Sequence, residues 1–247
     1  MSEFSHGQWR GADGQSADHG AKDVSSARVF AAHIRYFLAL TARGGGQVLD
    51  EGGVVAWAGV HPFPFLVNGA APIDGTVDPD VALDIIAEFF GAAGRSRYEV
   101  LALGGRDEHL IAAATARDLE ASGPSPLQLL DRPLAGEAGE PLAGVETRWA
   151  AAPDDVAEVV GVAQRAHRVY GFPDDLWPAV FGQPETILAP DVHVVVASRD
   201  GEAVATAQVH VQGGTAYVGW VAVVPEAGRL SLGTHVTRLV VDRGIEH

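Results

Sequence analysis

The clearest pattern in the chain is a run of β-branched and aromatic residues at 217–224, which predicts a buried strand that stops at Pro225. Beyond it, apolar residues return at steps of three and four, the spacing of one helix face. These residues are Leu232, Val236, Leu239 and Val240, and Gly244 is a plausible stop. The pattern therefore predicts a strand, a short turn and a helix.

An antiparallel meander is predicted before this helix. Residues 193–198 and 203–211 alternate like strands, and the Asp-Gly pair between them is a hairpin signature. A Gln-Gly-Gly turn leads into the strand at 215–224. Upstream, 145–149 is a short strand candidate, and Pro153 opens a helix with an acidic first turn and an apolar face. The C-terminal part is thus α/β with mostly antiparallel strands.

The first half has an α/β pattern of its own. Residues 1–25 are polar and predict a disordered tail, and 26–43 predict a helix in which Tyr36 and Phe37 serve core or interdomain packing. Further elements are strands within 48–60 and at 98–103 and helices from Asp78 and over 107–120. The Gly- and Glu-rich stretch 135–143 predicts a linker between an N-terminal domain, 26–134, and a second domain, 144–247.

Composition narrows the classes of function. The chain has 247 residues, 47% of them hydrophobic, which is enough for substantial cores. Its net charge of −15 gives a nucleic-acid role little support. The absence of cysteine excludes disulfides and thiolate metal sites, and the isolated His6 and His19 do not argue for a metal. With no membrane-spanning stretch and no signal peptide, we expect a cytoplasmic protein.

The turn before the last helix has the chemistry of an anion site. The first N–H groups of a helix have no intrahelical partner, and the helix dipole favours negative charge there. A phosphate can therefore dock on the amides of residues 229–234. The simpler alternative is an ordinary strand-to-helix turn.

This segment resembles the acyl-CoA motif of the GNAT superfamily of N-acetyltransferases. Residues 221–227 and 232–234 match the family pattern, but Gly228 stands where the family most often has arginine. Arg229 lies one place later, Ser231 replaces the motif's first glycine, and Gly233 matches its second. A side chain at Ser231 crowds a pyrophosphate, whereas its hydroxyl can cap the helix or bind phosphate. The cofactor-binding residues that the resemblance implies are Val221, Val223, Gly228, Arg229, Leu230, Ser231, Leu232, Gly233 and Thr234.

The resemblance implies a GNAT-like fold, with mixed and mostly antiparallel sheet flanked by helices, over about 144–247. The layout of the first half is loosely similar to the degenerate first domain of tandem GNAT proteins. The implied function is N-acetyl transfer from acetyl-CoA to a primary amine of a small molecule or peptide, by direct attack. Such a protein has no nucleic-acid or membrane partner and needs no metal, and a homodimer is one arrangement open to it.

In the family a further strand and helix follow the CoA loop, whereas here only three residues follow Gly244. The expectation is a fold incomplete at its C-terminus, through truncation, degeneration or supply of a strand by another subunit. The alternative function is a catalytically inactive GNAT-like module that binds a ligand or partner chain.

The catalytic acid and base stay unassigned from the sequence. His210, Tyr217 and Glu226 lie in the right neighbourhood, although the sequence favours a structural or solvent-exposed position for each. Tyr170, Phe172 and Trp177 are candidates for an amine pocket or for a hydrophobic plug.

Overall fold

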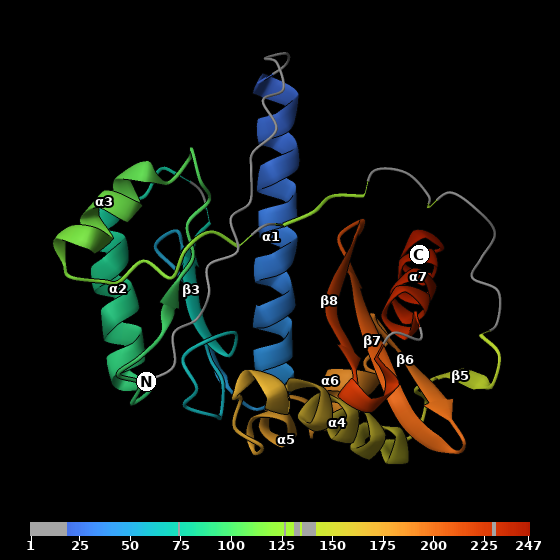
Figure 1. The fold of residues 1–247 in the computed structure, drawn as a ribbon. Coiled ribbons are helices and arrows are strands. Elements are labelled where there is room, and N and C mark those ends of the chain that lie inside the picture. Colours follow the sequence, from blue (N-terminus) through green and yellow to red (C-terminus); the bar gives the residue numbers. More distant parts are fainter. Residues whose placement is uncertain (1–18, 74, 126, 131–133, 135–141, 229–230) are drawn as a thin grey trace.

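The computed structural model describes residues 19–73, 75–125, 127–130, 134, 142–228 and 231–247. These residues form two four-stranded sheets, one in each half of the chain (Figure 1). Helix α1 (His19–Arg43) stands between the two sheets. None of the helices in this part of the chain combines the length and apolar character that crossing a bilayer requires.

The N-terminal sheet has the order β1-β2-β3-β4. The first three strands are antiparallel and β4 pairs parallel to β3. Its elements are β1 (Gln47–Glu51), β2 (Val54–Ala58), β3 (Asn68–Pro72), α2 (Pro79–Ala92), β4 (Glu99–Val100) and α3 (Glu108–Ala116). The predicted start of α2 is confirmed, because the Asp78 carboxylate accepts hydrogen bonds from the amides of Asp80 and Val81 at 3.0 and 3.1 Å.

The C-terminal sheet is an antiparallel meander in the order β5-β6-β7-β8. Its strands are β5 (Val145–Trp149), β6 (Val192–Arg199), β7 (Glu202–Gln212) and β8 (Thr215–Val223). The helices are α4 (Pro153–His167), η1 (Arg168–Tyr170), α5 (Leu176–Phe181), α6 (Pro184–Leu188), η2 (Pro225–Ala227) and α7 (Leu232–Ile245). Every element predicted in this half is present, so the α/β fold class is confirmed.

Two differences from the sequence prediction lie in the first half. Helix α1 begins at His19 rather than at residue 26, so part of the predicted tail is helical, while residues 1–18 lie outside the described residues. Strand β3 was not predicted, because its sequence Asn-Gly-Ala-Ala-Pro has no β-branched or aromatic residue. It is nevertheless fully buried between β2 and β4. The predicted linker, 135–143, falls mostly outside the described residues.

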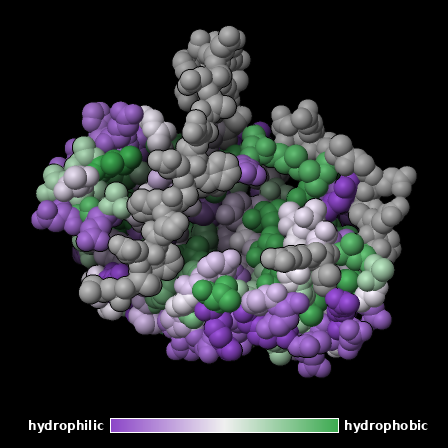
Figure 2. All heavy atoms as spheres, in the orientation of Figure 1, coloured by the Kyte–Doolittle hydropathy of each residue, from purple (hydrophilic) through white to green (hydrophobic). Residues whose placement is uncertain are grey.

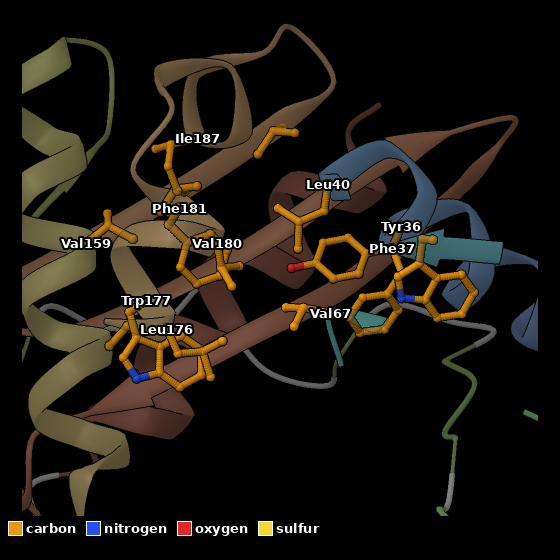
Figure 3. Packing of buried hydrophobic residues seen from close by; sticks show 14 of the residues in the cluster. Tyr36, Phe37, Leu40, Val67, Val159, Leu176, Trp177, Val180, Phe181 and Ile187 are labelled. Atoms are coloured by element: carbon orange, nitrogen blue, oxygen red, sulfur yellow. The ribbon is translucent and has the colours of Figure 1, made fainter. Parts of the chain in front are cut away.

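One hydrophobic core joins the two halves (Figure 3). Tyr36, Phe37 and Leu40 of α1 belong to this core together with Trp57 of the first sheet and residues of α5. The rings of Phe37 and Trp57 stack at 5.6 Å, and Trp177 of α5 is 1% exposed. Helix α1 therefore packs against residues of both halves of the chain.

Hydrophilic and hydrophobic residues gather on different parts of the molecular surface. Figure 2 shows hydrophilic residues along the side where α4 and α5 lie and hydrophobic residues gathered where β8 lies. Strand β8 is an edge of its sheet, and Val221 on it is 37% exposed. Most residues of β8 are partly exposed.

Candidate functional site

Strand β8 carries a bulge in its middle. Gln208 of β7 pairs with Trp220, but the next residue, Val209, pairs with Val218, which leaves Gly219 as the extra residue. A bulge interrupts the regular ladder and is frequent beside active sites. No strand in the described part of the chain pairs with the outer edge of β8. The strand therefore offers an open edge with an irregularity at Gly219.

The loop after β8 turns the chain into α7. Gly228 is exposed and extended, with φ −57° and ψ 153°. Arg229 and Leu230, both predicted to bind the cofactor, lie outside the described residues. Ser231 is the N-cap of α7 and has the left-handed φ of 58° and ψ of 13°. Glycine adopts this conformation at little cost, which gives a physical reason for the family's glycine at this position.

Ser231 does not cap the helix with its hydroxyl. Its side chain makes no capping hydrogen bond, in contrast to one of the roles that the sequence allows. The Ser231 residue is exposed, so its hydroxyl is accessible to solvent.

The first turn of α7 presents amides that the helix does not use. Among the residues that the structure describes, the first N–H of the helix to bond to a preceding carbonyl is that of His235, which donates to the Ser231 carbonyl at 2.9 Å. The amides of Leu232, Gly233 and Thr234 precede that ladder, and the positive end of the helix dipole lies there. Buried Leu232, 1% exposed, anchors this end of the helix, whereas Thr234 is exposed.

Gly233 leaves space at this helix end. Within the described part of the chain, a Cβ added to it would meet only the Val223 Cγ2 atom, at 3.6 Å, which is ordinary van der Waals contact. Val223 is half-buried, and Val221, two residues earlier on the same face of β8, is exposed. The structure therefore brings the described residues of the predicted site together at one end of α7. The amide donors of the first helical turn there suit a phosphate.

Of the three catalytic candidates, His210 is buried and Glu226 is exposed. His210 is 2% exposed, and its Nε2 lies 2.8 Å from an oxygen of Asp191. Burial lowers the pKa of His210, which the hydrogen bond to Asp191 only partly offsets. Glu226 is exposed in η2 and has a position suited to solvent contact.

Asp191 joins His210 to α1. The Nη2 of Arg43 donates to both oxygens of this carboxylate, each at 2.7 Å. Burial acts to raise the pKa of Asp191, but the hydrogen bonds from Arg43 and His210 outweigh it and hold that pKa below its usual range. These contacts hold α1 against the sheet, so we assign His210 a structural role.

Tyr217, the third candidate, faces α1. Its hydroxyl lies 2.7 Å from Nδ1 of His33, and its ring centroid lies 5.0 Å from that of Tyr36. Tyr36 donates a hydrogen bond of 2.8 Å to the Gln208 side chain. Its ring also covers Gly219, where a Cβ would come within 2.4 Å of the Tyr36 Cζ atom.

The sequence did not point to His33 or Tyr36 as parts of this site. The predicted packing role of Tyr36 is confirmed, but its partner is the bulge of a strand more than 170 residues away. No local pattern reveals such a pairing.

The aromatic residues expected near the acceptor have mixed positions. Trp177 is 1% exposed and packs on Trp220 and Phe181, so it is a core residue. Phe172 is half-buried against Trp177, and Tyr170 is 75% exposed. The hydrophobic plug therefore describes Trp177 and Phe172 better than a shared amine pocket does.

Comparisons with known proteins concern the family of the C-terminal part and the fold of the chain. Residues 135–247 match the family model described as an acetyltransferase (GNAT) domain. The chain is similar to the structure of a GCN5-related N-acetyltransferase from Kribbella flavida, with a TM-score of 0.58 and 20% identity over 90% of this chain and 81% of that one. A structure of PaiA N-acetyltransferase from Thermoplasma acidophilum in complex with coenzyme A gives a TM-score of 0.33 and 13% identity, over 41% and 74% of the two chains. No curated protein matches the sequence.

Proposed function

We propose that this chain, which carries a GNAT acetyltransferase domain in residues 135–247, is an acetyl-CoA-dependent N-acetyltransferase acting on a primary amine of a small molecule or peptide. The observation that carries the proposal is the meeting of an unpaired, bulged strand edge with the amide-lined start of α7. The unpaired strand edge suits an extended thioester arm, and the amides at the start of α7 suit a pyrophosphate.

The amides of Leu232, Gly233 and Thr234 hold the pyrophosphate in this proposal. Gly233 has no side chain of its own to keep an anion away from the backbone. The side chain of Ser231 is the one departure from the family that narrows the site. Because it is exposed and makes no capping bond, its hydroxyl is free to donate to a phosphate oxygen.

The edge of β8 leads from the pyrophosphate to the bulge. From Val223, beside Gly233, to Gly219 the strand is about 13 Å long at roughly 3.3 Å per residue. An extended arm bound along this edge therefore brings its far end to Gly219. The bulge leaves backbone groups out of the regular ladder there, and an N–H aimed at a developing oxyanion is an effective catalytic element.

Acetyl-CoA supplies an acyl thioester, which an amine attacks directly, so the chain needs no covalent nucleophile. The residues around Gly219 must then orient the two reactants, exclude water and move one proton from the amine to the leaving sulfur. The excess of acidic residues, 32 against 17 basic, is compatible with a cationic acceptor.

Calorimetric titration with acetyl-CoA tests the donor site, with free pyrophosphate as competitor. We expect wild-type protein to bind and Gly233→Ala to bind at least about tenfold more weakly, because the methyl group takes space from the pyrophosphate. Gly161→Ala is the matched control: this helical glycine of α4 has no atom within 4 Å of an added Cβ and lies outside the loop. Equal affinity of the two variants would refute the loop assignment.

The titration also decides between the two functions. A folded protein that binds neither acetyl-CoA nor pyrophosphate would favour the alternative of a non-catalytic GNAT-like module, whose exposed β8 edge binds another chain.

A further inference from the structure

A residue pair from opposite ends of the chain lies beside the bulge. His33 comes from α1 and Tyr217 from β8, and the His33 Nδ1 atom is 2.7 Å from the Tyr217 hydroxyl oxygen. The two rings meet edge to face with centroids 5.6 Å apart, and the Phe37 ring also meets the His33 ring edge to face, at 4.9 Å. Their relative orientation is therefore fixed by packing as well as by the hydrogen bond.

Tyr36 links this pair to Gly219. Its ring touches the position that a side chain at 219 would occupy, and it lies 5.0 Å from the ring of Tyr217. Tyr217 and Gly219 are also only two residues apart on β8. The hydroxyl of Tyr217 thus belongs to the groups that surround the far end of the proposed thioester path.

Both members of the pair are uncharged at neutral pH. Burial lowers the pKa of His33 to about 4 and raises the pKa of Tyr217 to about 12, because it penalises the imidazolium and the phenolate. A mechanism that charges either group would have to overcome the cost of a buried charge. A relay that returns both groups to a neutral form avoids that cost.

We propose that His33 and Tyr217 form a proton relay for acetyl transfer, so that the N-terminal half of the chain supplies a catalytic residue to the C-terminal domain. The inference rests on the proposed function. The amine lone pair forms the new C–N bond, and the C–S bond breaks with its electron pair on sulfur. His33 Nε2 takes a proton from the amine nitrogen, its Nδ1–H proton passes to the Tyr217 oxygen, and the Tyr217 O–H proton goes to the sulfur.

This step balances without an ion on either side chain. The products are an amide and the free thiol of CoA, Tyr217 is again a phenol, and His33 is left as its other neutral tautomer. Both side chains are only half-buried, so exchange with water restores the starting tautomer before the next turnover.

The test uses acetyl-CoA with hydroxylamine as a small surrogate acceptor and follows release of the CoA thiol. We expect Tyr217→Phe and His33→Ala each to lower kcat about 100-fold with the KM for acetyl-CoA unchanged. The double variant should lose no more than either single one, because the pair acts as a unit. Arg43→Gln is the control, since it breaks another contact of α1 with the sheet and should leave kcat unchanged.

Other outcomes overturn the relay. Additive losses in the double variant, or an equal loss in Arg43→Gln, would show that the pair only docks α1. Wild-type protein that binds acetyl-CoA in the calorimeter but releases no thiol above the uncatalysed rate would refute the relay and leave the donor site intact. Absence of binding would refute the proposed function itself.

A second readout is independent of turnover. Two-bond ¹H–¹⁵N correlation spectra of the free protein report which ring nitrogen of each histidine carries the proton. The relay requires His33 to carry it on Nδ1, with the Tyr217 oxygen as acceptor. A resting His33 protonated on Nε2 would overturn the proposal.

Discussion

Replacing Gly219 with alanine should destabilise the protein strongly, although it adds a single methyl group. The new Cβ would lie 2.4, 2.5 and 2.8 Å from three carbons of the Tyr36 ring. That ring is 2% exposed and is held by Phe37 and Tyr217, so it has no free direction in which to move. Either α1 shifts from the sheet or the ring rotates away from Gln208.

The cost follows from these two responses. Forcing a methyl group into a packed interior costs about 2 kcal/mol. Losing the 2.8 Å hydrogen bond from Tyr36 leaves the Gln208 oxygen buried without a donor, at a cost of about 1–3 kcal/mol. Since the two responses are alternatives, we expect the free energy of unfolding to fall by about 2 kcal/mol, the cost of either one.

Urea unfolding followed by tryptophan fluorescence measures this loss, with Gly161→Ala as the control that should be neutral or stabilising by up to about 1 kcal/mol. In a Tyr36→Ala background the space is vacated, so Gly219→Ala should then cost almost nothing. A Gly219→Ala protein within about 0.5 kcal/mol of wild type would refute the contact, as would an equal cost in both backgrounds.

Three further outcomes are expected. Ser231→Gly should stabilise the protein by about 1 kcal/mol in urea unfolding, because it relieves a left-handed φ and removes no capping bond, whereas Ser231→Ala should not. Stability should fall by about 2 kcal/mol as the pH drops from about 6.5 towards 4, since His33 binds a proton more readily in the unfolded chain; His33→Gln should flatten this part of the pH profile. Asp191→Asn should cost about 2 kcal/mol of unfolding free energy by weakening the bonds to Arg43 and His210, and Asp200→Asn, at an exposed turn, should leave stability unchanged.

The C-terminal half could be predicted from the sequence because its signals are local. Alternating β-branched residues, an Asp-Gly turn and an acidic first helical turn mark the elements from β5 to α7 independently of what packs on them. The amide-lined start of α7 follows from the same signals. What the family motif adds is the expectation that the anion bound there is the pyrophosphate of CoA.

The parts that could not be predicted depend on tertiary contacts. Strand β3 exists because its small residues fit beneath β2: a Cβ at Gly69 would lie 2.4 Å from the Trp57 ring. These residues have a low intrinsic propensity for β-strands, and the packing of the buried strand outweighs it. In the same way, the relay partner of Tyr217 is His33, whose own neighbours on α1 give no sign of it.

Helix α1 also constrains how the two halves of the chain diverge in evolution. Its contacts pair positions 36 with 219, 33 with 217 and 43 with 191, across what the composition presents as a domain boundary. In related sequences each pair should therefore change together, with a side chain accepted at 219 only where position 36 has lost its aromatic ring. A comparison restricted to residues 135–247 records one member of each pair and misses the covariation.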